Sequence, residues 1–158
     1  MPAGVSASAE TVTWAEFARE EPELARFGAE RLTASPAYLA TVRRSGVPRV
    51  RPVTPIFTEE GLYLYMEPTS PKARDIREQR WFSLHNGVPD NAGSGGEFNV
   101  TGHGFEIDDP EMWNHVADAS SYEPADRYIL FELRLTEARS HGYGDVPMPP
   151  TRSWSLGR

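Results

Sequence analysis

The segment Glu97–Ile107 is long enough for a single extended β-strand, but its apolar side changes partway along. Phe98 and Val100 fall on one face by the two-residue alternation of a strand, whereas Phe105 falls on the other. Gly102-His103-Gly104 stands at the change, where a β-bulge or a sharp bend would turn the strand over. A long strand that bends in this way favours a curled sheet or a barrel over a flat sheet.

Five more segments carry the alternation or the composition of strands, so six strands are expected in all. They are Tyr38–Arg44, Val47–Phe57, Leu62–Met66, Trp81–Asn86 and Tyr128–Arg139. Ser45-Gly46 is typical of a hairpin turn between the first two. Four helices are expected as well, beginning near Thr13, Pro22, Pro71 and Asp109. This order predicts a mainly β fold with peripheral helices, built as a small six-stranded antiparallel barrel.

The chain of 158 residues is expected to be one domain, because this length allows one proper core but is small for a two-domain enzyme. Residues 1–12 lack a basic start and an apolar block, and are expected to form a disordered lead. Residues 13–158 are expected to form the domain, with an extended, proline-rich C-terminal tail anchored by Trp154. Nothing resembles a signal peptide or a membrane span, so a cytoplasmic location is expected by default.

Composition and missing motifs exclude several classes of function. The chain has no cysteine, which excludes disulfides, thiol catalysis and thiolate metal sites. Its four histidines show no close pairing in the sequence, so no metal site is expected. The net charge of −7 argues against a general nucleic-acid binder. There is no G-x-S-x-G of a serine hydrolase, and Gly93–Gly96 lacks the lysine of a phosphate-binding P-loop.

Positive charge is concentrated in the segment Arg43–Arg80, which holds eight of the 16 basic residues but only five of the 23 acidic ones. Within it, Ser70 is a favoured helix N-cap and Pro71 suits the first helical position. Lys72 and Arg74 then occupy the first turn, where the helix dipole disfavours cations. An anion that neutralises them would explain this placement, and a phosphate fits best.

The strand expected at Pro48–Ile56 contains three prolines and two arginines. Prolines lack a backbone donor, so the strand lies at a sheet edge or is broken. Arg49 and Arg51 are two residues apart and project from the same face. Charges and prolines also protect a sheet edge against pairing with another chain, and alone this would be the better explanation. Together with the anion site at Ser70, ligand binding becomes the better one.

These segments together resemble the pyridoxamine 5′-phosphate oxidase-like split-barrel flavoproteins. A G-x-P-x-x-x-P-V pattern, a strand and an S-x-K-x-R helix start carry the resemblance, in Gly46–Pro55, Gly61–Met66 and Ser70–Arg74. Further likeness lies in Val100–Gly102, in Asp109–Glu111 and in the Trp154 tail. The resemblance covers the chain from about residue 14 to its end, and it implies a six-stranded split barrel.

The resemblance also implies where a cofactor would lie. In the family, the strand matching Arg49–Thr54 lies along the isoalloxazine ring and the ribityl chain, and positions in Ser70–Arg74 hold the phosphate. An arginine of the preceding strand often helps, for which Arg51 is the candidate and Arg49 the second choice. The cofactor-binding residues implied are Arg49, Arg51, Pro52, Val53, Thr54, Met66, Ser70, Lys72 and Arg74.

Cofactor sites in this family are built across a dimer interface, so a homodimer is implied. Trp154 or the Gly96–Asn99 region is a candidate to reach the partner's cofactor. FMN, the deazaflavin F420 and haem all occur on this fold, with FMN the first choice here and haem the last.

The leading expectation is an FMN-binding oxidoreductase that transfers hydride to an unidentified small substrate from an unidentified electron donor, with no catalytic residue assigned. The alternatives are an F420-dependent reductase and a non-catalytic flavin- or haem-binding protein. A vitamin B6 oxidase is not expected, because the further residues that hold the substrate phosphate in true pyridoxamine phosphate oxidases are not found. A structural dimer with a degenerate site is the weakest alternative, since Ser70, Lys72 and Arg74 are intact.

Overall fold

The computed structural model of the chain describes residues 10–34 and 36–157. Residues 1–9, most of the predicted disordered lead, lie outside the described residues. Thr11 is buried, and the backbone of Val12 exchanges hydrogen bonds of 3.0 and 2.7 Å with Leu135. The packed part of the chain therefore begins before the predicted boundary at residue 13.

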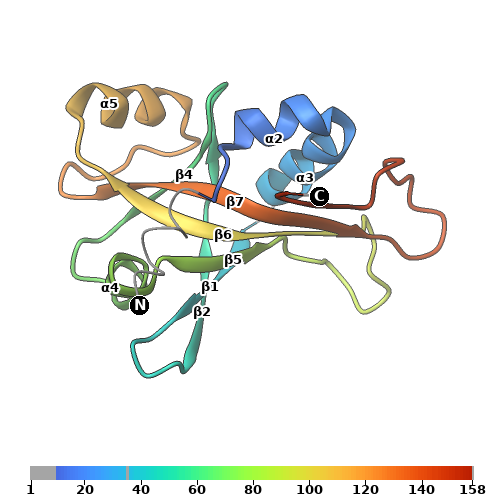
Figure 1. The fold of residues 1–158 in the computed structure, drawn as a ribbon, viewed down its shortest axis with the longest axis horizontal. Coiled ribbons are helices and arrows are strands. Elements are labelled where there is room, and N and C mark those ends of the chain that lie inside the picture. Colours follow the sequence, from blue (N-terminus) through green and yellow to red (C-terminus); the bar gives the residue numbers. More distant parts are fainter. Residues whose placement is uncertain (1–9, 35, 158) are drawn as a thin grey trace.

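The described residues contain four helices and eight strands, joined by loops (Figure 1). The helices are α2 (Trp14–Glu20), α3 (Pro22–Ala34), α4 (Pro71–Gln79) and α5 (Pro110–Ala119). The strands are β1 (Ala37–Val42), β2 (Pro48–Val53), β3 (Ile56–Phe57), β4 (Leu62–Met66), β5 (Trp81–His85), β6 (Glu97–Ile107), β7 (Ile129–His141) and β8 (Ser153–Ser155). Each of the six predicted strand segments contains a strand, and the four predicted helices form.

A single antiparallel sheet holds these strands in the order β2-β1-β5-β6-β7-β4-β3, with β8 paired to β7. The long strands β6 and β7 run side by side through the middle of the molecule (Figure 1). The end strands β2 and β3 do not pair with each other, so the sheet curls without closing. The predicted split-barrel class is therefore confirmed.

The predicted strand Val47–Phe57 is in fact two strands, because the ladder stops at Thr54-Pro55. Val53 still pairs with β1, whereas Ile56 pairs with β4, so the two pieces belong to opposite ends of the sheet. A proline has no N–H to continue a ladder, which accounts for the break at this position. We call this break at Thr54-Pro55 the seam, because the barrel does not close between β2 and β3 there.

The predicted bulge in β6 is confirmed as a shift in the pairing register with β7 between Thr101 and Gly102. At this point the two backbones approach closely. A Cβ atom on Gly102 would lie 1.8 Å from the carbonyl oxygen of Arg134. Glycine is therefore required here by contact with the neighbouring strand.

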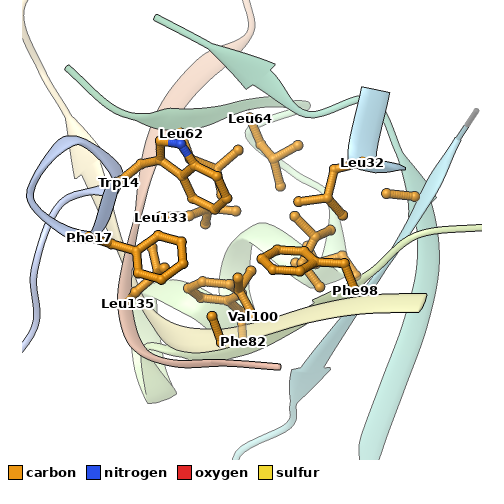
Figure 2. Packing of buried hydrophobic residues seen from close by; sticks show 14 of the residues in the cluster. Trp14, Phe17, Leu32, Leu62, Leu64, Phe82, Phe98, Val100, Leu133 and Leu135 are labelled. Atoms are coloured by element: carbon orange, nitrogen blue, oxygen red, sulfur yellow. The ribbon is translucent and has the colours of Figure 1, made fainter. Parts of the chain in front are cut away.

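The main hydrophobic core lies inside the curl of the sheet, with α2 and α3 contributing side chains to it (Figure 2). Its labelled members are Trp14, Phe17, Leu32, Leu62, Leu64, Phe82, Phe98, Val100, Leu133 and Leu135. A second cluster lies beneath α5 and contains Ile56, Tyr63, Tyr65, Val116 and Leu130. No helix of the described residues has both the length and the apolar character that a membrane crossing needs.

The C-terminal tail is anchored by Trp154, as predicted, and its anchor is the chain's own core. The indole ring lies 5.0 Å from the ring of Phe17, and its N–H donates to Glu20 at 3.3 Å. Trp154 is buried, and β8 around it extends the sheet next to β7. In this chain the indole is therefore packed in the core, with 6% of Trp154 exposed.

Candidate functional site

Helix α4 begins where the sequence predicts. Ser70 has extended backbone (φ −69°, ψ 145°), its hydroxyl accepts a hydrogen bond of 3.4 Å from the Ala73 amide, and Pro71 is the first helical residue. No acidic residue stands in the first turn. Lys72 and Arg74 therefore face the positive end of the helix dipole with no acid of that turn to balance them.

Lys72 and Arg51 lie close enough for their charges to repel. The pKa of Lys72 is lowered, first by burial and then by the positive charge of Arg51, while the charge of Glu67 acts in the opposite direction. Glu67 is already engaged by Arg127 through two hydrogen bonds of 2.8 Å. Neither Lys72 nor Arg51 has an ion pair with another described residue. Together they form an unbalanced pair of cations that a bound anion would relieve.

Arg49 is engaged elsewhere, although it lies on the same strand face as Arg51. Its Nε donates to Asp75 Oδ2 at 2.8 Å, and the hydroxyl of Thr41 donates to the same oxygen at 2.7 Å. Asp75 is 5% exposed and the Arg49 side chain 17%. This group ties β2 to α4 and β1, and Arg49 thereby neutralises the acid that would otherwise reduce the positive charge of the site.

The other predicted contact residues divide into accessible and buried side chains. Pro52 and Thr54 are exposed and Val53 is half-buried, at the end of an edge strand that pairs only with β1. Arg74 is exposed and has no ion pair with another described residue. Met66, by contrast, is 1% exposed and packs in the main core. Among the predicted contact residues, Met66 is therefore the one whose side chain is not accessible to a ligand.

Asp75 is the residue of this site that the sequence interpretation missed. The signal was its position beside Ala73 and Ile76, the other buried residues of α4. A carboxylate on the inward face of a helix requires a hydrogen-bonding or charged partner. The arginines of β2 are the cations able to fill that role from the same face of the barrel.

We expect Asp75→Ala to lower the free energy of unfolding by about 2–3 kcal/mol, because it leaves Arg49 and the buried Thr41 hydroxyl without their acceptor. Asp75→Asn keeps an acceptor for Thr41 and removes only the charge, so it should cost about half as much. Urea denaturation followed by circular dichroism measures both. An unchanged midpoint for Asp75→Ala would show that the pair does not stabilise the fold.

The histidines are spread over several elements. His85 contacts Glu97 at 2.8 Å, and His115 contacts Glu60 at 3.2 Å. His103 is buried beside the ring of Trp81, with the ring centroids 4.2 Å apart. Across residues 10–34 and 36–157, no three histidine or acidic side chains gather into a group that could hold a metal ion.

Comparison with known proteins identifies the fold. No family model and no curated protein matches the sequence. HutZ, the heme storage protein from Vibrio cholerae, is 19% identical with a TM-score of 0.60, over 78% of this chain and 96% of HutZ. A NimC/NimA family protein from Clostridium acetobutylicum is 20% identical with a TM-score of 0.63, over 84% of this chain and 93% of that one.

A protein from Listeria innocua, provisionally assigned as a pyridoxamine 5′-phosphate oxidase, shares the same architecture. It is 15% identical with a TM-score of 0.58, over 74% of this chain and 96% of its own. At these identities the likeness establishes a shared fold, the split barrel of pyridoxamine 5′-phosphate oxidase-like proteins.

Proposed function

We propose that the Lys72–Arg51 pair at the start of α4 binds the phosphate of FMN, and that the chain is an FMN-dependent oxidoreductase of the pyridoxamine 5′-phosphate oxidase-like family. The observation that carries this proposal is the unbalanced charge. A half-buried lysine, whose pKa is lowered first by desolvation and then by the charge of Arg51, lies at a helix N-terminus that holds no acid. Such a site gains most from a ligand with two negative charges.

The residues present fit the phosphate and ribityl part of a flavin. Lys72, Arg51 and Arg74 would hold the phosphate, with the Ser70 end of α4 adding the helix dipole. The edge strand β2 and Thr54, which directly follows it, would support the rest of the molecule along the open side of the strand. The bound flavin would supply hydride transfer, and the protein would position it and leave one ring face open to substrate.

A homodimer is part of this proposal, because a monomer leaves the flavin exposed at the edge of the sheet. The sheet face away from the main core carries three large exposed hydrophobic side chains on neighbouring strands, Tyr38, Val50 and Trp81. Val50 is 58% exposed. A second copy packed on this face would bury these side chains and cover β2, along which the flavin would lie.

Two alternatives differ from this proposal in the ligand or in the chemistry. An F420-dependent reductase would use the same cations with a different ring. A non-catalytic FMN- or haem-binding protein is favoured by the structural likeness to a heme storage protein. With FMN or F420 as the ligand, the same residues, Lys72, Arg51 and Arg74, would hold the phosphate.

Absorption spectroscopy of the protein after incubation with FMN, F420 or haem, followed by gel filtration, tests the proposal. We expect the protein to retain the flavin absorption bands. Retention of F420 or a haem Soret band alone would select an alternative, and retention of none would refute all three. Reduction of the bound FMN by a nicotinamide donor, with turnover of an acceptor, separates an enzyme from a storage protein.

A further inference from the structure

A cavity of about 340 Å³ opens at the seam of the barrel, where β2 ends and β3 begins. Its walls come from the end of α3, from the β2–β3 junction and from the end of α5 with the segment that follows it. Leu32 and Ile56 form its buried floor, and Phe57 adds a half-buried aromatic wall. These three elements meet because the seam sends β3 to the opposite end of the sheet from β2.

None of the nine residues that line this cavity carries a charge. Two of them, Thr54 and Ser121, have exposed hydroxyl side chains that make no hydrogen bond to another described residue. An apolar wall with a few free polar groups is typical of small-molecule sites. An ionised ligand would lose its hydration here without gaining a counter-ion, so the cavity disfavours charge.

Thr54 directly follows β2, the strand that is proposed to support the flavin. It follows Arg51 by three residues, which corresponds to roughly 10 Å of extended chain. A ribityl phosphate chain can span that separation. If the phosphate lies at Lys72 and Arg51, the flavin ring reaches the mouth of the cavity at Thr54. This step rests on the proposed function.

We propose that the cavity is the substrate subsite, and that it binds an uncharged molecule of one or two fused rings beside the flavin ring. An apolar cavity of roughly 150 Å³ holds benzene, so one twice that size accommodates two fused rings. A hydroxyl or carbonyl on the substrate would bond to Thr54 or Ser121. Substrates that carry a carboxylate or a phosphate on the ring are excluded by the uncharged lining.

Equilibrium dialysis at pH 7 with 1-naphthol and 1-naphthoate tests this subsite. The two probes have the same rings and differ in charge. We expect naphthol to bind and naphthoate to bind about tenfold more weakly or worse, because its carboxylate finds no partner. Equal affinity for the two probes, or no binding of naphthol, would overturn the proposal.

A filling variant locates the binding. Ala119 lines the cavity at the exposed end of α5, so Ala119→Trp should fill it without disturbing the core. We expect it to weaken naphthol binding about fivefold or more. Ala92→Trp is the matched control: Ala92 is exposed on the loop before β6, so this substitution should leave naphthol binding unchanged. Ser121→Trp repeats the test if circular dichroism shows that Ala119→Trp does not fold. Unchanged naphthol binding in a folded filling variant would refute the site.

The same titrations separate this inference from the proposed function. In cofactor-free protein, Lys72→Ala should leave naphthol binding unchanged while it weakens FMN binding. In the FMN-loaded protein, naphthol should alter the flavin absorption spectrum, because the two rings are adjacent. Naphthol that binds without changing the flavin spectrum would overturn the substrate subsite, even with the FMN proposal intact. If the native chain does not bind FMN, the FMN proposal is overturned. The preference for naphthol over naphthoate would then still test whether the cavity binds uncharged rings.

Discussion

Replacing Lys72 with alanine is expected to weaken FMN binding about tenfold or more, because one charge-assisted contact to a buried phosphate is worth roughly 1.5–3 kcal/mol. The double variant Arg51→Ala/Lys72→Ala removes both members of the unbalanced pair and should lose about a hundredfold or more. Quenching of flavin fluorescence on titration with protein measures both affinities. Unchanged affinity in the double variant would refute the phosphate assignment.

Two controls separate a specific clamp from general electrostatics. Arg44→Ala removes one positive charge from the same basic segment, where Arg44 is exposed and paired with Glu78. It should leave the affinity nearly unchanged, since exposed pairs contribute little. Lys72→Arg keeps the charge and should recover part of the binding that Lys72→Ala loses. Equal losses from Arg44→Ala and Lys72→Ala would point to net charge and not to a site.

Gly102→Ala is expected to lower the free energy of unfolding by about 3 kcal/mol or more, the largest stability effect among the predictions. The new methyl group would meet the backbone carbonyl of Arg134, which cannot move without breaking the β6–β7 ladder at its bulge. Urea denaturation followed by tryptophan fluorescence measures the loss. A midpoint within error of the native protein would mean that the two strands separate freely at this point.

Gly104→Ala is the matched control on the same strand. Its methyl group would meet the Ile76 side chain, 2.6 Å from Cγ2, and makes no comparable backbone contact. Ile76 is buried and β-branched, so it must shift as a whole, but no backbone ladder is broken and the substitution should cost about 1–2 kcal/mol, less than Gly102→Ala. A larger loss from Gly104→Ala than from Gly102→Ala would contradict the backbone-contact explanation.

Much of the fold was predictable because its signals are local. The bulge at Gly102 follows from the change of apolar face in one strand, and the helix start at Ser70 follows from capping rules. The seam at Thr54-Pro55 was harder to predict from the sequence. The prolines predicted an edge or a break, but which strand Ile56 would join depends on the closure of the whole sheet.

The site divides along the same line. The gathering of basic residues near the start of α4 could be predicted from the sequence, whereas the partner of each arginine could not. Arg49 and Arg51 share a strand face in the sequence, and only the packing of α4 on β1 and β2 shows that Arg49 pairs with Asp75. Met66 likewise looks like a site residue on its strand, yet the curl of the sheet turns it into the core.

The repulsion between Lys72 and Arg51 also bears on how much of this protein a cell would retain. A ligand that binds only the folded chain stabilises it by an amount that rises with the logarithm of the ligand concentration, and an anion bound here would also offset the repulsion between Lys72 and Arg51. Copies without cofactor would populate the unfolded state more often and be degraded sooner. On the proposed function, the abundance of the protein would therefore follow the cofactor supply without a separate regulator.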